Sequence, residues 1–163
     1  MNKTNFGKKI VKSKTKKILI KNLFNNVSKQ YDLMNDLMSF GLHRFWKKDL
    51  IDNIKENNPS VILDLAGGTG DISSLLSKKF SESSILIYDL SYEMMNYSRK
   101  KIPSNNISYI NGSAEQLAID ENSIDFITLS FGLRNFTNIE HSIKECYRVL
   151  KYGGKIYCLE FSP

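Results

Sequence analysis

Short apolar runs alternate with amphipathic segments of helical period in the part of the chain that follows Pro59. This alternation is typical of βαβ units, whose crossover helices produce a parallel sheet. We expect five strands, at residues 61–65, 84–88, 107–110, 124–129 and 155–161. We expect helices at residues 71–79, 91–101 and 138–150, and a turn at 152–154. The pattern therefore predicts an α/β fold built on a parallel sheet of about five strands.

Before Pro59 the apolar positions follow helical spacing. We expect a polar, mobile segment at residues 1–14 and helices at residues 15–27, 31–38 and 43–56. The last of these carries an apolar face formed by Phe45, Trp46, Leu50, Ile51 and Ile54. We therefore divide the chain into a basic arm with N-terminal helices, residues 1–58, and an α/β domain, residues 59–163.

Charge is unevenly distributed along the 163 residues, which is a length typical of one domain. Residues 1–31 hold nine lysines and no acid, so the arm carries +9 and the remainder −3 of a formal net charge of +6. The body shows little sign of a nucleic-acid surface. A solvated tail is the simpler interpretation of the arm, with anionic lipid or nucleic acid as alternative partners. The two cysteines, Cys146 and Cys158, indicate a reducing compartment and a packing role.

The first predicted strand runs into a glycine-rich loop that contains Gly67, Gly68, Thr69 and Gly70. Glycines let a backbone approach a ligand closely, because no Cβ intervenes. Asp64 lies inside the apolar run, where a carboxylate is costly unless it is paired. The loop lacks both the G-x-G-x-x-G spacing of dinucleotide sites and the lysine of a phosphate-binding loop. It favours a nucleoside without a pyrophosphate, although an ordinary strand-to-helix turn is the alternative.

Parallel sheets bind ligands at the carboxyl ends of their strands, which selects the residues that follow each predicted strand. Asp89 ends the second strand and could accept hydrogen bonds from both ribose hydroxyls, or it could cap the next helix. Ser113 could be a turn residue, and Arg134 and Asn135 could belong to a solvated loop. Because Asp64, the glycines, Asp89, Ser113 and Ser130 all fall on one predicted edge, we favour a binding site there.

Several motifs together resemble those of one enzyme family. They are K-Q-Y-D-L-M-N-D-L-M-S at 29–39, G-L-H-R-F-W-K at 41–47, the glycine loop at 63–71, S-F-G-L-R-N at 130–135, R-V-L-K-Y-G-G at 148–154 and L-E-F-S at 159–162. The chain is similar to the ubiquinone/menaquinone biosynthesis C-methyltransferases of the UbiE type. The glycine loop and R-V-L-K motif occur in many methyltransferases that use S-adenosylmethionine (SAM), whereas the first motif and S-F-G-L-R-N are more specific.

The resemblance implies the Rossmann-like fold of class I SAM methyltransferases, with SAM as methyl donor and a polyprenyl quinol as substrate. It places Asp64 near the methionine ammonium and the three loop glycines as scaffold. SAM binding falls on Thr69, Asp89, Ser113, Ala114 and Ser130. The catalytic candidates are Arg134, which would stabilise an oxyanion, Asn135, which would bind the quinol, and Tyr31 and His43, which would close over the ring.

The prenyl tail of such a substrate also bears on location and partners. We expect a bacterial cytoplasmic protein whose lysine-rich arm contacts anionic lipid, no nucleic-acid partner, and either a homo-oligomer or a quinone-biosynthesis complex. Members of the family continue past the L-E-F-S segment with two more strands. We therefore expect a truncated chain with an exposed sheet edge, lower stability and reduced or absent activity.

Two departures from the family pattern are Tyr152, in place of proline, and 118–120, where a proline-containing stretch is usual. Three alternative functions remain open at this point. They are a SAM methyltransferase acting on another small molecule, a nucleotide-binding oxidoreductase, and a non-catalytic SAM-binding remnant. A substrate panel, NAD titration and calorimetry with SAM would distinguish them.

Overall fold

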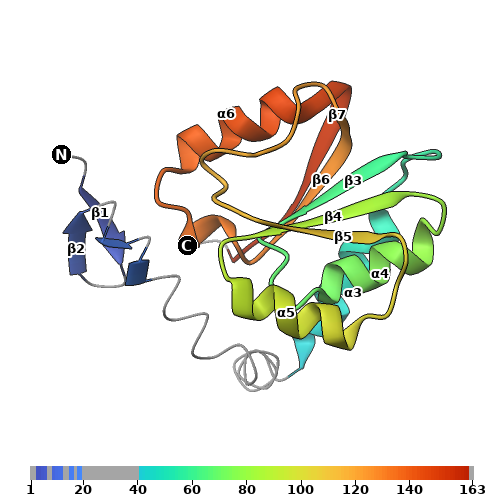
Figure 1. Ribbon diagram of the computed structural model, residues 1–163, viewed down its shortest axis with the longest axis horizontal. Coiled ribbons are helices and arrows are strands. Elements are labelled where there is room, and N and C mark those ends of the chain that lie inside the picture. Colours follow the sequence, from blue (N-terminus) through green and yellow to red (C-terminus); the bar gives the residue numbers. More distant parts are fainter. Residues whose placement is uncertain (1–2, 7–8, 13–14, 17, 20–40, 162–163) are drawn as a thin grey trace.

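The central feature of the fold is a five-stranded parallel sheet, seen in a computed structural model that describes residues 3–6, 9–12, 15–16, 18–19 and 41–161. The strands follow the order β5-β4-β3-β6-β7 (Figure 1). Their bounds are β3 (Val61–Leu65), β4 (Ser84–Asp89), β5 (Ile107–Asn111), β6 (Ile124–Ser130) and β7 (Leu150–Leu159). The predicted α/β class and the number of strands are confirmed.

The first strand of the sheet, β3, lies at its centre. Leu63 pairs in parallel register with Leu86 of β4 on one side and with Ile127 of β6 on the other. The chain fills the β4 side first and then crosses to the β6 side, so the strand order reverses next to β3. Reversal of this kind opens a crevice at the carboxyl ends of the strands, because the loops on either side diverge.

Helices cover both faces of the sheet. In Figure 1, α3 (Leu42–Asn53), α4 (Asp71–Lys79) and α5 (Tyr92–Lys101) lie below it, whereas α6 (Ile139–Val149) lies above it. The Oγ of Ser91 accepts the Met94 amide at the start of α5, and Asn138 accepts the His141 amide at the start of α6. These caps satisfy backbone groups that a helix start leaves unpaired, which fixes both starts close to the predicted positions.

Two apolar layers form the core, one on each face of the sheet. Because side chains alternate along a strand, Leu63 and Leu65 face α6, while Ile62 packs with Leu76 of α4. All four side chains are almost fully buried. Burial of one such side chain contributes roughly 1.5–3 kcal/mol, so the sheet and its two layers hold the loops of the crevice in place.

The helix α3 differs from its prediction in both face and length. It buries His43, Lys47 and Ile51, while Phe45 is largely exposed, so the predicted apolar face is wrong in part. The helix ends at Asn53, because Ile54 adopts an extended conformation instead of continuing to residue 56. Ile54 itself is buried, as expected. A buried lysine on this face was not foreseen, since lysine normally marks a solvated position.

The strand β7 begins earlier than predicted, at Leu150 instead of residue 155. The predicted turn at 152–154 lies within the strand as an irregularity, where the register moves from Ile124↔Leu150 to Phe126↔Lys155. Gly153 has a φ of 80° in this bulge, a value that a residue without a Cβ adopts readily. The 3₁₀ helix η1 (Leu133–Asn135), which follows β6, was also not predicted.

The N-terminal arm contains secondary structure where we expected a mobile segment. Strands β1 (Lys3–Phe6) and β2 (Lys9–Lys12) pair in antiparallel register, with Thr4 opposite Val11 and Asn5 opposite Ile10. The β-branched residues in these pairs favour strand pairing. Residues 15–16 and 18–19 are helical, as predicted, but most of that helix and the whole predicted helix at 31–38 lie outside the described residues. Within the described parts of the chain, no helix has the length and apolar character needed to cross a membrane.

Candidate active site

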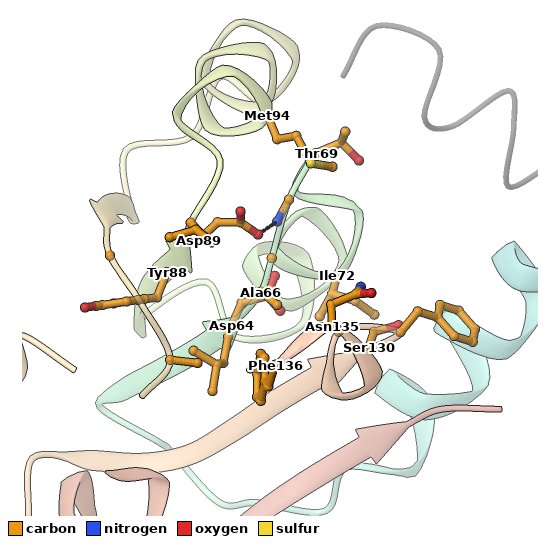
Figure 2. A pocket seen from close by; sticks show the side chains of 18 of the residues that line it. Asp64, Ala66, Thr69, Ile72, Tyr88, Asp89, Met94, Ser130, Asn135 and Phe136 are labelled. Atoms are coloured by element: carbon orange, nitrogen blue, oxygen red, sulfur yellow. Dashed lines mark hydrogen bonds between the residues drawn. The ribbon is translucent and has the colours of Figure 1, made fainter. Parts of the chain in front are cut away.

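A cleft of about 940 Å³ opens at the carboxyl ends of β3, β4 and β6. Its walls come from the loop after β3, the end of β4, residues 112–115 and residues 130–137. Figure 2 shows Asp89 and Met94 on one side, Ser130, Asn135 and Phe136 on the other, and Ala66 between them. The position of the cleft is the one that the strand-end rule selects.

The glycine loop forms a tight turn at the floor of the cleft. The amide of Ala66 donates to the Tyr88 carbonyl at 2.8 Å, and the amide of Gly70 donates to the Gly67 carbonyl at 2.8 Å. A Cβ added to Gly67 would lie 2.9 Å from the Oδ2 of Asp64, so no larger residue fits there without displacement. Gly70 supports the turn from outside the cleft lining, with a φ of 80°.

Asp64 lies beneath this turn with only 1% of its surface exposed. Its carboxylate accepts hydrogen bonds from the Ser73 hydroxyl at 2.5 Å and the Thr128 hydroxyl at 3.0 Å. Burial raises the pKa of Asp64 to about 6, although these two bonds and the positive charge of Lys47 oppose the shift. Hydroxyl donors satisfy the carboxylate geometrically without neutralising it, so a cation in the cleft would be attracted to it.

Asp89 occupies the neighbouring wall at the end of β4. Its Oδ2 accepts the Gly68 amide at 2.9 Å, drawn as a dashed line in Figure 2, and its Oδ1 accepts the Ser91 amide at 2.7 Å. Burial raises its pKa to about 6, with these amide bonds acting in the opposite direction. The side chain therefore fixes the glycine loop and the approach to α5, while Ser91 is the residue that caps the helix.

The remaining walls combine apolar surface with a few polar atoms. Met94, Ile72 and Phe136 provide apolar contacts, and the amide of Thr137 donates to Glu115 at 2.8 Å. The Ser113 hydroxyl donates to Glu115, so this predicted residue lines the cleft with its hydroxyl already engaged. In the part of the chain that the structure describes, the buried Oγ of Ser130 has no hydrogen-bond partner. A buried orphan hydroxyl at a cleft wall is suited to a ligand donor or acceptor.

The four catalytic candidates do not all line the cleft. Asn135 lines the cleft, but Arg134 does not: its guanidinium pairs with Glu160 at 3.2 Å and lies over the Phe161 ring, 5.3 Å from the centroid. His43 is buried in α3, outside the cleft lining, and Tyr31 lies outside the described residues. Among the predicted cofactor residues, Asp64, Gly67, Gly68, Thr69, Asp89, Ser113, Ala114 and Ser130 all line the cleft.

Sequence reasoning missed several residues of the cleft, of which Lys47 and Asp71 form an ion pair at 2.8 Å. Asp71 also pairs with Lys101 at 2.7 Å. Burial tends to raise the pKa of Asp71, but the two ammonium groups outweigh it and lower the pKa to about 2. Met94 and Phe136 were missed as well. Lys47 lies within the 41–47 motif but was not expected in the cleft, because an amphipathic helix normally directs lysine to solvent.

These features together fit SAM, a nucleoside that carries a sulfonium and an ammonium group. Two carboxylates with raised pKa values suit a cationic ligand, the glycine loop admits close approach, and the apolar walls suit an adenine ring. The orphan Ser130 hydroxyl offers a further polar contact. The donor set is therefore compatible with SAM, which supplies an electrophilic methyl group when bound.

Solved structures share this architecture. The putative methyltransferase in complex with the Trm112 activator from Haloferax volcanii superposes with a TM-score of 0.73 at 21% identity, over 83% of this chain and 58% of that one. A putative SAM-dependent methyltransferase from Methanococcus maripaludis gives a TM-score of 0.65 at 23% identity, over 95% and 66% of the two chains. These likenesses show that the chain has the fold of class I SAM-dependent methyltransferases.

Sequence comparison assigns the family. The profile of the ubiE/COQ5 methyltransferase family matches residues 10–163. Proteins named ubiquinone/menaquinone biosynthesis C-methyltransferase UbiE are 47% identical in Rickettsia bellii and 48% in Rickettsia prowazekii, each over 99% of this chain and 68% of the relative. The protein of that name from Haemophilus ducreyi is 42% identical over 98% of this chain and 63% of its own length. The chain belongs to the ubiE/COQ5 methyltransferase family, and it spans about two thirds of the length of these relatives.

Proposed function

We propose that this chain transfers the methyl group of SAM to a ring carbon of a polyprenyl quinol, in the biosynthesis of menaquinone or ubiquinone. The observation that carries the proposal is identity of 42–48% with proteins named ubiquinone/menaquinone biosynthesis C-methyltransferase, over nearly the whole chain. The candidate substrates are quinols with a naphthoquinol ring, a methoxy-benzoquinol ring or both kinds, so both ring types belong in the assay.

Different residues of the cleft would contact different parts of SAM. Asp89 would accept the ribose hydroxyls while its second bonds hold the glycine loop and α5 in place. Asp64 would attract the methionine ammonium through the loop, and Ser130 would contribute its hydroxyl. Met94 and Phe136 would enclose the base, and Ala114 leaves room beside it. These residues bind and orient, so their value is in placing the reacting methyl group.

For the quinol, the protein has to favour loss of the hydroxyl proton next to the reacting carbon. A cation or a hydrogen-bond donor near the developing oxyanion achieves this. Asn135 lines the cleft and would bind the ring oxygen. Arg134 precedes it, and its bonds to Glu160 hold the guanidinium beside the cleft, from which it would act on the oxyanion or on a water molecule. Tyr31 and His43 stay candidates for the cover over the ring, which we assign to residues 1–58.

The lysine-rich arm would bring the enzyme to its lipid substrate as a peripheral, cytoplasmic protein. Nine lysines and no acid within residues 1–31 support attraction to anionic lipid. Co-sedimentation with vesicles containing anionic lipid, with and without residues 1–28, tests this part; equal binding by the two forms would exclude it. Self-association or a complex with other enzymes of the pathway would be checked by light scattering of the same samples.

Calorimetry with SAM, followed by a transfer assay on the same sample, tests the proposed function. We expect SAM binding, and transfer of a labelled methyl group to demethylmenaquinol or methoxy-benzoquinol that mass spectrometry locates on a ring carbon. Binding without transfer to either quinol would favour another substrate or a non-catalytic role. Binding of NAD in preference to SAM would contradict the proposal.

A further inference from the structure

Lys47 is an unusual component of the cleft, because it is a lysine with only 7% of its surface exposed. It projects from α3, lines the cleft and forms an ion pair with Asp71 of α4 at 2.8 Å. Lysine is almost never this buried unless it is paired or serves a ligand. No role for Lys47 was predicted from the sequence.

Lys47 uses only part of its hydrogen-bonding capacity on the described residues around it. Asp71 provides one carboxylate, and two ammonium groups contact it, Lys47 through Oδ2 and Lys101 through Oδ1. The two ammonium groups lower the pKa of Asp71, so this carboxylate is ionised and holds Lys47 in an ion pair. An ammonium has three donors, and among the described residues the one hydrogen bond of Lys47 goes to Asp71. An anion that enters the cleft would accept hydrogen bonds from the remaining donors of Lys47.

Opposite charges lie close by on the floor of the same cleft. The positive charge of Lys47 opposes the burial that raises the pKa of Asp64, so the two groups of the cleft lie within electrostatic reach of each other. A ligand that carries an ammonium and a carboxylate on one carbon atom would match this arrangement, with its ammonium toward Asp64 and its carboxylate toward Lys47. The amino-acid end of SAM has this structure.

We propose that Lys47 binds the carboxylate of the methionine moiety of SAM, an assignment that rests on the proposed function. Asp71 holds the lysine in position from the start of α4, and α3 thereby becomes part of the cofactor site. Lys101 supports Asp71 from α5, and its side chain is 37% exposed and does not line the cleft. The two lysines therefore contact one carboxylate but differ in access to the ligand.

Calorimetry on the whole chain with three ligands tests the assignment. The ligands are SAM, decarboxylated SAM, which lacks only the carboxylate, and methylthioadenosine, which lacks the amino-acid end. We expect Lys47→Met to weaken SAM binding about 30-fold, in line with a charge-assisted hydrogen bond, and to change binding of the other two ligands less than about threefold. Lys144→Met, the matched control at an exposed lysine paired with Glu140 on α6, should change all three less than about threefold, and Lys47→Arg should restore most of the SAM affinity.

Equal weakening of SAM and decarboxylated SAM by Lys47→Met would overturn the assignment, as would SAM binding at the level of the native chain. Circular dichroism checks the fold of each variant, and Lys47→Gln replaces Lys47→Met if the latter does not fold. The failure of the proposed function would look different, because the unsubstituted chain would then either not bind SAM or bind it without methyl transfer to either quinol. If it binds SAM and Lys47→Gln binds equally well, the assignment of Lys47 fails by itself.

Discussion

The aspartates on the strands differ between the two ends of the sheet in the direction of their pKa shifts. At the amino end, Asp125 accepts the amides of Ser60 and Val61 at 2.9 and 2.7 Å and pairs with Lys151 at 2.7 Å. Partial burial works against the charge, but these partners outweigh it and lower the pKa of Asp125. At the carboxyl end, burial raises the pKa values of Asp64 and Asp89 to about 6.

This difference in pKa shift indicates that Asp125 has a structural role, whereas Asp64 and Asp89 are suited to binding a ligand. Asp125 has its cation within the fold, so its charge stabilises the native state in the absence of any ligand. Asp64 and Asp89 receive hydroxyl and amide donors, and among the described residues no cation in direct contact compensates their desolvation. Perturbed groups of this kind cluster at functional sites. A cationic cofactor would supply the missing charge.

Replacing one glycine at each end of the sheet by alanine should give the largest difference in stability. Gly70 and Gly153 share a φ of 80°, but a Cβ on Gly70 would lie 2.2 Å from the Ser98 hydroxyl, whereas no described atom lies within 4 Å of one on Gly153. We expect Gly70→Ala to lower the free energy of unfolding by about 3 kcal/mol, from strain plus overpacking, and Gly153→Ala by about 1 kcal/mol, from strain alone. Urea denaturation measures both, and equal losses would contradict the tight packing under the glycine loop.

Removing one charge at each end should produce opposite phenotypes. We expect Asp89→Asn to weaken SAM binding about 30-fold, because the amide is a poorer acceptor for ribose hydroxyls, with little loss of stability. Asp125→Asn should leave SAM affinity within about threefold while lowering the free energy of unfolding by about 1–2 kcal/mol. Calorimetry and denaturation of the two variants provide the comparison, and similar behaviour of both would remove the distinction between the ends.

Substitution of Arg134 tests whether residues at the carboxyl end of the sheet also take part in methyl transfer. We expect Arg134→Ala to reduce turnover about tenfold through loss of oxyanion stabilisation, with SAM affinity unchanged. Lys144→Ala is the matched control, since Lys144 is an exposed cation paired with Glu140 on α6. The quinol transfer assay decides, and unchanged turnover in Arg134→Ala would end the role assigned to this residue.

The smallest effect should appear in the dependence on pH. Asp64 and Asp89 have folded-state pKa values near 6, above the ordinary value of 3.8, so the folded chain binds more protons than the unfolded chain at pH 5. As the pH falls from 7 to 5, each acid should therefore add about 1 kcal/mol to the free energy of unfolding. The affinity for SAM should decrease over the same change in pH, because the carboxylates become protonated. The contribution of Asp71, whose pKa is about 2, should be lost only below about pH 4. Denaturation at several pH values checks this, and Asp89→Asn should remove about half of the gain.

The carboxyl end of the sheet could be predicted from the sequence because its residues are local to strand ends. Asp64, Asp89 and Ser130 follow directly from the positions of β3, β4 and β6, and the glycines mark the turn between β3 and α4. Side-chain contacts across distant segments could not be predicted. Lys47 meets Asp71 across 24 positions, and Arg134 meets Glu160 across 26. Each such pair depends on how helices and loops pack, which periodicity does not encode.

The β7 bulge illustrates a further limit. The sequence Tyr152-Gly153-Gly154 has the chemistry of a turn, and the φ of Gly153 agrees with that expectation. The pairing of Ile124 with Leu150 nevertheless extends the strand on the other side of the glycines. Tertiary pairing with β6 thus overrides the local signal, as sheet context commonly does.

A crystal structure of the chain with SAM would test most directly whether the carboxyl-end acids serve a cationic cofactor. We expect the ribose hydroxyls within about 3 Å of the Asp89 carboxylate and the methionine ammonium on the side of Asp64. SAM bound elsewhere, or bound in the cleft with its ribose out of hydrogen-bond reach of Asp89, would contradict the account.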